Sequence, residues 1–106
     1  MSMNIVNLRR SLFPIFQQYR IEKAILFGSF AREENSLHSD VDLILIKKTN
    51  QRFFDRYDKI LVDLNKAMPD YELDVLIYTP DELEQIAERP FIAQALKDGR
   101  VLYESK

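Results

Sequence analysis

Two aspartates separated by one residue, Asp40 and Asp42, stand at the start of an apolar run over residues 41–46. In a β-strand, residues i and i+2 point to the same face, with Cα atoms about 6–7 Å apart. Two aligned carboxylates can bind a pair of hard cations about 3.5–4 Å apart, and magnesium prefers such oxygen ligands. The same Asp-x-Asp pattern also occurs where a strand simply begins and its end is solvated.

A third aspartate, Asp74, lies inside a second apolar run over residues 73–78. An ionised carboxylate buried there without a partner would cost several kcal/mol. On a strand beside the first pair, Asp74 would bind a metal ion or accept a proton from an attacking hydroxyl. The alternative is an edge strand on which Asp74 faces water.

Gly28 and Ser29 follow a short apolar run over residues 24–27 and precede an expected short helix over residues 29–34. A glycine lets the backbone approach a ligand closely, and helix N-terminal amides attract anions, so a triphosphate would suit this turn. A simple tight turn is the alternative. Taken with the three aspartates, the turn favours phosphoryl-type transfer, which needs anion positioning and metal neutralisation. With no cysteine and one histidine, His38, the sequence offers no thiol nucleophile for other chemistry.

The first part of the chain predicts helices and strands that would position these groups. Apolar residues recur at helical spacing over residues 4–19, with Pro14 predicting a kink or two short pieces. The apolar runs at 24–27, 41–46 and 73–78 predict three strands. Thr49 and Asn50 are expected to cap a long helix that ends before Pro69 and buries Phe53, Phe54 and Tyr57.

The remaining residues predict two helices and a fourth, marginal strand. Thr79, Pro80 and Glu82 match a capping box with proline at the first helical position. Pro90 opens a second helix through residue 96, with Gly99 as its C-terminal cap, and residues 101–103 form the marginal strand. We therefore expect an α/β (α+β-like) fold in a single domain over residues 1–106, with helices flanking a small mixed sheet of three to four strands.

Length, composition and charge narrow the classes of protein. The chain has 106 residues, of which 46% are hydrophobic and 30% charged, as in an ordinary globular domain. The net charge of −2 disfavours binding to long nucleic acids, which usually requires a basic surplus. The chain lacks an apolar run of about 18 residues that would span a membrane, and its N-terminus lacks the pattern of a signal peptide. We expect a cytoplasmic protein.

Two segments resemble a known signature. Residues 28–32 (Gly-Ser-Phe-Ala-Arg) and 39–43 (Ser-Asp-Val-Asp-Leu) are similar to the motif of the DNA polymerase beta-like nucleotidyltransferase superfamily, and within it to the minimal nucleotidyltransferase (MNT) group. The resemblance implies a nucleotidyltransferase with a mixed sheet flanked by helices. It implies that Asp40 and Asp42 ligate two magnesium ions, with manganese as an alternative, and that Asp74 ligates one ion and activates the acceptor.

The same resemblance assigns the nucleotide-binding residues. Gly28 and Ser29 would hold the triphosphate of ATP, with Ser39 and Arg32 as further nucleotide-binding residues. A solvated helix position is the alternative for Arg32. The family usually has glycine after this arginine, whereas Glu33 stands here, which changes the expected conformation of the loop.

The resemblance also implies a partner, because MNT proteins often pair with an all-helical HEPN protein. In some pairs the HEPN subunit is a toxic ribonuclease, and the transferase is the antitoxin that adds AMP to one of its tyrosines. Residues 91–96 and the N-terminal helix are candidate docking surfaces. Two alternatives remain open: a transferase for a small molecule such as an aminoglycoside, and an antitoxin that acts by contact alone. A homo-oligomer is also compatible with the sequence.

Overall fold

The computed structural model describes residues 4–28 and 40–105. The predictions for Ser29, Arg32, Glu33, His38 and Ser39, and for a helix over residues 29–34, lie outside these residues. The described elements run in the order α1 (Ile5–Gln18), β1 (Lys23–Phe27), β2 (Val41–Ile46), the 3-10 helix η1 (Phe53–Arg56), α3 (Asp58–Ala67), β3 (Leu73–Tyr78), α4 (Pro80–Ile86), α5 (Pro90–Asp98) and β4 (Arg100–Glu104).

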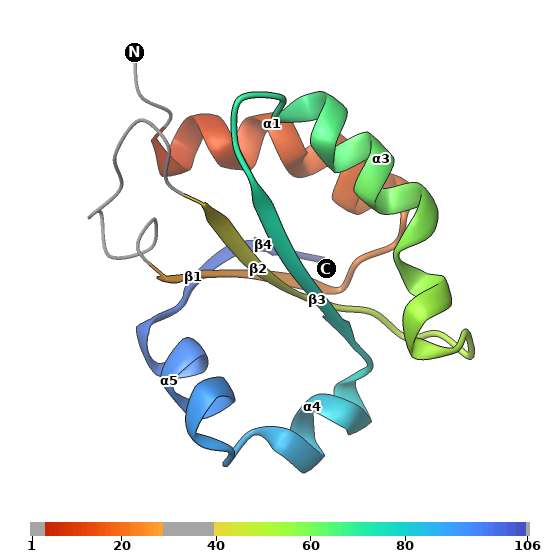
Figure 1. Cartoon of the computed structure of the whole chain (residues 1–106), viewed down its shortest axis with the longest axis vertical. Helices are drawn as coiled ribbons and strands as arrows, with labels where there is room; N and C mark the ends of the chain where they lie inside the picture. Colours follow the sequence, from red (N-terminus) through yellow and green to blue (C-terminus); the bar gives the residue numbers. More distant parts are fainter. Residues whose placement is uncertain (1–3, 29–39, 106) are drawn as a thin grey trace.

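The sheet has four strands in the order β3-β2-β1-β4. Strand β1 is antiparallel to both β2 and β4, whereas β2 and β3 are parallel. Helices α1 and α3 lie on one side of this sheet, and α4 and α5 lie on the other (Figure 1). The prediction of a small mixed sheet of three to four strands flanked by helices is confirmed.

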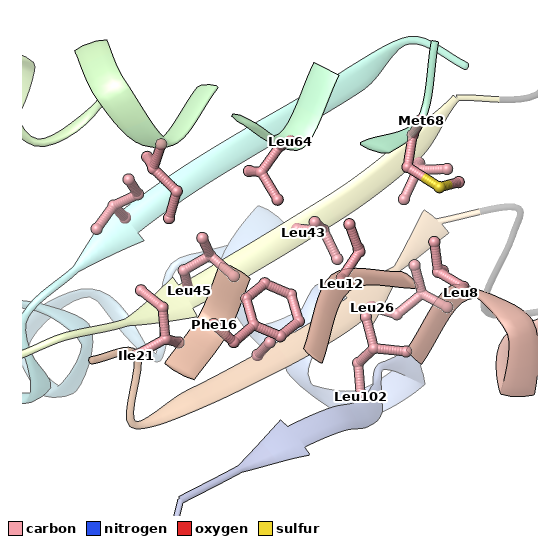
Figure 2. Close-up of a cluster of buried hydrophobic side chains, with 14 residues drawn as sticks. Leu8, Leu12, Phe16, Ile21, Leu26, Leu43, Leu45, Leu64, Met68 and Leu102 are labelled. Carbon is pink, nitrogen blue, oxygen red and sulfur yellow. The ribbon is translucent and has the colours of Figure 1, made fainter. Parts of the chain in front are cut away.

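The main hydrophobic core lies between the sheet and the α1–α3 pair (Figure 2). Helix α1 places Leu8, Leu12 and Phe16 on one face at a spacing of four residues, and all three are fully buried. Helix α3 adds Leu64, which is also fully buried. Because strand residues alternate between faces, every second residue of β1 and β2 completes this core.

Helix α1 is a single helix, so the prediction of two short pieces at Pro14 is wrong. A proline inside a helix removes one backbone hydrogen bond, to the carbonyl of the residue four positions earlier. Pro14 lies on the exposed side of α1, where water can replace that bond. The helix is held instead by its buried face and by Asn4, whose side chain accepts a hydrogen bond from the Asn7 amide.

The predicted long helix after Thr49 and Asn50 is also different. Thr49 Oγ1 accepts a hydrogen bond from the Gln51 amide at 3.1 Å, which closes a turn and not a helix. The 3-10 helix η1 follows, and α3 begins only at Asp58. Phe54 was expected in the core but is 81% exposed, because the 3-10 turn directs it away from the sheet.

The helix caps in the second half of the chain agree closely with those predicted from the sequence. Thr79 and Glu82 form the predicted capping box, and Pro90 is at the start of α5. Gly99 ends α5 as predicted, but in an extended conformation. It is required there because a Cβ atom would lie 2.6 Å from both Ala95 O and Ile25 Cγ2. Over the part of the chain that the structure describes, none of the helices has the length and apolar character needed to cross a bilayer.

Candidate functional site

A cavity of about 690 Å³ opens where β1 ends and β2 and β3 begin. These three strand ends meet because β1 is antiparallel to β2 while β3 is parallel to β2. The strands form one wall, and α5 forms the other. The described residues that line the cavity are Phe27, Gly28, Asp42, Asp74, Val75, Leu76, Phe91, Gln94, Ala95 and Asp98.

Asp42 and Asp74 are direct neighbours across the β2–β3 pair. Neighbouring strands lie about 4.7–4.9 Å apart, so these two carboxylates share one face at the same level of the sheet. Strand β3 is an edge strand and Asp74 is exposed, as the alternative interpretation expected. Asp74 nevertheless lines the cavity together with Asp42. The edge position therefore gives Asp74 solvent access within the candidate site.

Gly28 directly follows β1 and has a left-handed conformation, with φ of +75°. A Cβ atom at this position would collide with Asp42 Oδ2 and would lie 3.2 Å from Asp42 Cγ. Both the backbone conformation and the space therefore require glycine here. The group that lies against Gly28 is the Asp42 carboxylate, whereas the close approach of a triphosphate stays a prediction.

Asp40 precedes β2, is half-buried and does not line the cavity. Across residues 4–28 and 40–105, no group of three His, Cys, Asp or Glu side chains is close enough to hold a metal ion. The structure thus brings Asp42 and Asp74 together and does not join Asp40 to them. Two carboxylates still fit magnesium, because this ion is usually bound by one or two carboxylates together with phosphates of the substrate.

The wall formed by α5 was not predicted as part of the site. Residues 91–96 stay a predicted docking surface, but two of them, Phe91 and Gln94, line the cavity together with Asp98. Phe91 is 61% exposed and its ring meets that of Phe27 edge-on, with centroids 5.8 Å apart. The spacing of these residues, at i, i+3 and i+7, was the available signal. It shows that they share a helix face, but not that this face meets Asp42.

Comparison with known proteins identifies a family and a relative. The family model described as polymerase beta, nucleotidyltransferase, matches residues 10–106. A curated protein of Methanocaldococcus jannaschii, provisionally named a protein adenylyltransferase, is 30% identical over 76 residues. That match covers 72% of this chain and 80% of the relative.

Two solved complexes contain chains with a similar fold. One is a toxin–antitoxin crystal structure with AMP-PNP, matched with a TM-score of 0.65 at 15% identity over 92% of this chain and 74% of that chain. The other is a tri-AMPylated HEPN toxin of Shewanella oneidensis in complex with an MNT antitoxin. Its matched chain has a TM-score of 0.63 at 14% identity, over 95% of this chain and 73% of that chain. At these identities the likeness concerns the fold.

Proposed function

We propose that this chain, which belongs to the polymerase beta nucleotidyltransferase family, transfers AMP from ATP to a hydroxyl group of a partner protein. The observation that supports this most is the Asp42–Asp74 pair, in register across two strands at the mouth of the cavity. The M. jannaschii relative supports protein as the acceptor class, through its name. The complex with AMP-PNP supports an adenine nucleotide as the donor.

The two aspartates have different expected roles. Asp42 would hold divalent magnesium or manganese, which supplies charge neutralisation for the triphosphate. Asp40 is proposed as a further ligand on the family motif alone, because in this structure it does not line the cavity. Asp74 is more exposed and lies on the edge strand, so it can reach an acceptor that approaches from solvent. It would accept the proton of the acceptor hydroxyl. Gly28 lets the backbone lie close to the Asp42 carboxylate, and Gly28, Ser29, Ser39 and Arg32 would form the triphosphate site.

The proposed reaction is balanced by these groups. The acceptor oxygen attacks the α-phosphorus of ATP, and the bond between the α-phosphorus and the bridging oxygen breaks. Pyrophosphate leaves with that oxygen, and the hydroxyl proton passes to Asp74. The product is an adenylylated acceptor, and the protein's contribution is positioning and electrostatic stabilisation.

The proposed acceptor is a tyrosine of a helical, HEPN-type partner in the cytoplasm, with this chain acting as the antitoxin. The Shewanella oneidensis complex, in which an AMPylated HEPN toxin is bound to an MNT antitoxin, supports this pairing. Exposed apolar side chains on α1, Val6 at 52% and Phe13 at 44%, provide a surface for such a partner.

Intact-mass measurement after co-expression with a helical, HEPN-type protein tests the proposal. The partner is expected to gain one or more AMP units in ATP and magnesium, and to gain none when Asp42 and Asp74 are both replaced by asparagine. A partner that is bound and silenced without any gain in mass would show an antitoxin that acts by contact alone. A gain on an aminoglycoside and none on the partner would instead identify a small-molecule transferase.

A further inference from the structure

Helix α5 turns one face toward the cavity. Phe91, Gln94, Ala95 and Asp98 lie at positions i, i+3, i+4 and i+7, which is the spacing of a single helix face. The opposite wall of the same cavity contains Gly28, Asp42 and Asp74. One side of the cavity therefore offers charged and backbone groups, and the other offers an apolar surface with two polar side chains.

The apolar part of this wall suits a flat ring. Ala95 is buried against the sheet, whereas Phe91 is 61% exposed beside the cavity. The ring of Phe91 meets that of Phe27 at an angle of 89°, while most of its own surface faces solvent. A planar heterocycle would cover this exposed ring and remove apolar surface from water.

The polar part of the wall is a hydrogen-bonded pair. Gln94 Nε2 donates to Asp98 Oδ2 at 2.5 Å. An ionised aspartate can only accept hydrogen bonds, and the glutamine oxygen is also an acceptor. After their mutual bond, the pair still offers amide and carboxylate oxygens as acceptors against a single amide N–H. It is therefore complementary to a ligand group that donates hydrogen bonds.

We propose that the Gln94–Asp98 pair recognises the 6-amino group of adenine and so selects ATP over nucleotides with a 6-oxo group. This inference rests on the proposed function, which makes a nucleoside triphosphate the substrate. The 6-amino group has two N–H donors, whereas guanine and hypoxanthine place a carbonyl oxygen at the same position and carry a donor on the neighbouring N1. That oxygen would face the acceptors of Gln94 and Asp98, so the pair would lose both donors at position 6.

Binding of ATP, GTP and ITP to the full chain in the presence of magnesium tests this selection. ITP is the sharpest probe, because it differs from ATP only in the base: an oxygen replaces the 6-amino group and N1 gains a proton, while the ribose and phosphates are unchanged. We expect ATP to bind at least about tenfold more tightly than ITP, the value expected for a hydrogen bond to a charged group. The double variant Gln94→Ala, Asp98→Ala should bind the three nucleotides with nearly equal affinity.

The ratio of affinities separates recognition from a structural effect. If the variant merely loosened α5, ATP and ITP affinity would fall together and their ratio would stay at the wild-type value. Lys97→Ala is the matched control, because Lys97 is exposed on the same helix and does not line the cavity. It should leave the ratio unchanged.

Two results would overturn the inference: equal binding of ATP and ITP by the wild type, or an unchanged ratio in the double variant. Both results leave the proposed function standing, because a triphosphate still binds. Failure of the wild type to bind any of the three nucleotides would instead contradict the proposed function itself.

Discussion

The two faces of the sheet are covered to very different extents. On the α1–α3 face, fourteen buried residues form one cluster within the described part of the chain (Figure 2). On the α5 face, the corresponding cluster has four, namely Ile25, Phe27, Ile44 and Ala95. A single strand supplies both faces, since Leu43 and Leu45 of β2 point to the first and Asp42 and Ile44 to the second.

The difference arises from the helices that cover each face. Helices α1 and α3 have 14 and 10 residues and each buries an apolar stripe. Helix α5 has 9 residues, and α4 has 7 residues with none buried. The second face is therefore left open at the end where β2 and β3 begin, which is where Asp42 and Asp74 lie. One face stabilises the fold, and the other provides space for a ligand.

The largest expected effect is a loss of activity, and it follows from a substitution on the α5 face of the sheet. Asp42→Asn removes a carboxylate that is expected to bind the metal, and should lower transfer by at least about a thousandfold. Turnover measured with labelled ATP, beside a thermal unfolding curve, checks this. Asp55→Asn is the control, because Asp55 is exposed on η1, near the other end of the sheet. Near-normal turnover in Asp42→Asn would exclude this residue from the site.

A substitution on the α1–α3 face should instead lower stability and leave activity nearly unchanged. Leu64 is fully buried between α3 and the sheet, so Leu64→Ala should reduce the free energy of unfolding by about 2–5 kcal/mol. Turnover per folded molecule should remain close to that of the wild type at temperatures below the transition. Val62→Ala on the same helix is the control, since Val62 is 52% exposed and should cost about 0.5 kcal/mol or less. Equal losses in the two variants would mean that α3 is not packed as described.

The sheet and several caps were predictable because their signals are local. The apolar runs that became β1, β2 and β3 lie within short stretches of sequence, and the capping box of Thr79 and Glu82 spans four residues. The need for glycine at position 28 was signalled by its place after a strand, but its neighbour in the structure, the Asp42 carboxylate, was not. The family resemblance correctly identified the nucleotidyltransferase family from the motif around Gly28 and Asp42.

The failures concern contacts between residues far apart in the sequence. The expected start of the long helix is replaced by the Thr49 turn and the 3-10 helix η1, and Arg56 of η1 bonds to Glu82, which lies 26 positions further on. The α5 wall was missed because its position against Asp42 depends on how the chain returns across the sheet. Neither contact has a local sequence signal.

The Arg56–Glu82 ion pair joins the two faces at the end of the sheet opposite the site. Arg56 Nη1 and Nη2 donate to Glu82 Oε1 and Oε2 at 2.6 and 3.0 Å, and Nη1 also donates to Ile77 O. The Thr79 amide donates to Glu82 Oε1 at 2.9 Å. The hydrogen bonds from Arg56, followed by the bond from the Thr79 backbone, lower the pKa of Glu82 from 4.5 to about 2. The pair links η1 on one side to α4 on the other.

The smallest expected effect is a pH-dependent loss of stability in Glu82→Gln. Because folding lowers the pKa of Glu82, its ionised form stabilises the fold fully above pH 4.5, and this contribution is lost as the pH falls toward 2. The Glu82 side chain is 40% exposed, so solvent screening should limit the difference between wild type and variant to about 1 kcal/mol near neutral pH. Urea unfolding at a series of pH values should show this difference shrink to nearly zero at about pH 2. Glu84→Gln, exposed on the same helix, should show no comparable change. A difference that stays constant over the whole range would mean that the charge of Glu82 does not stabilise the fold, and that its amide analogue only disturbs the capping box.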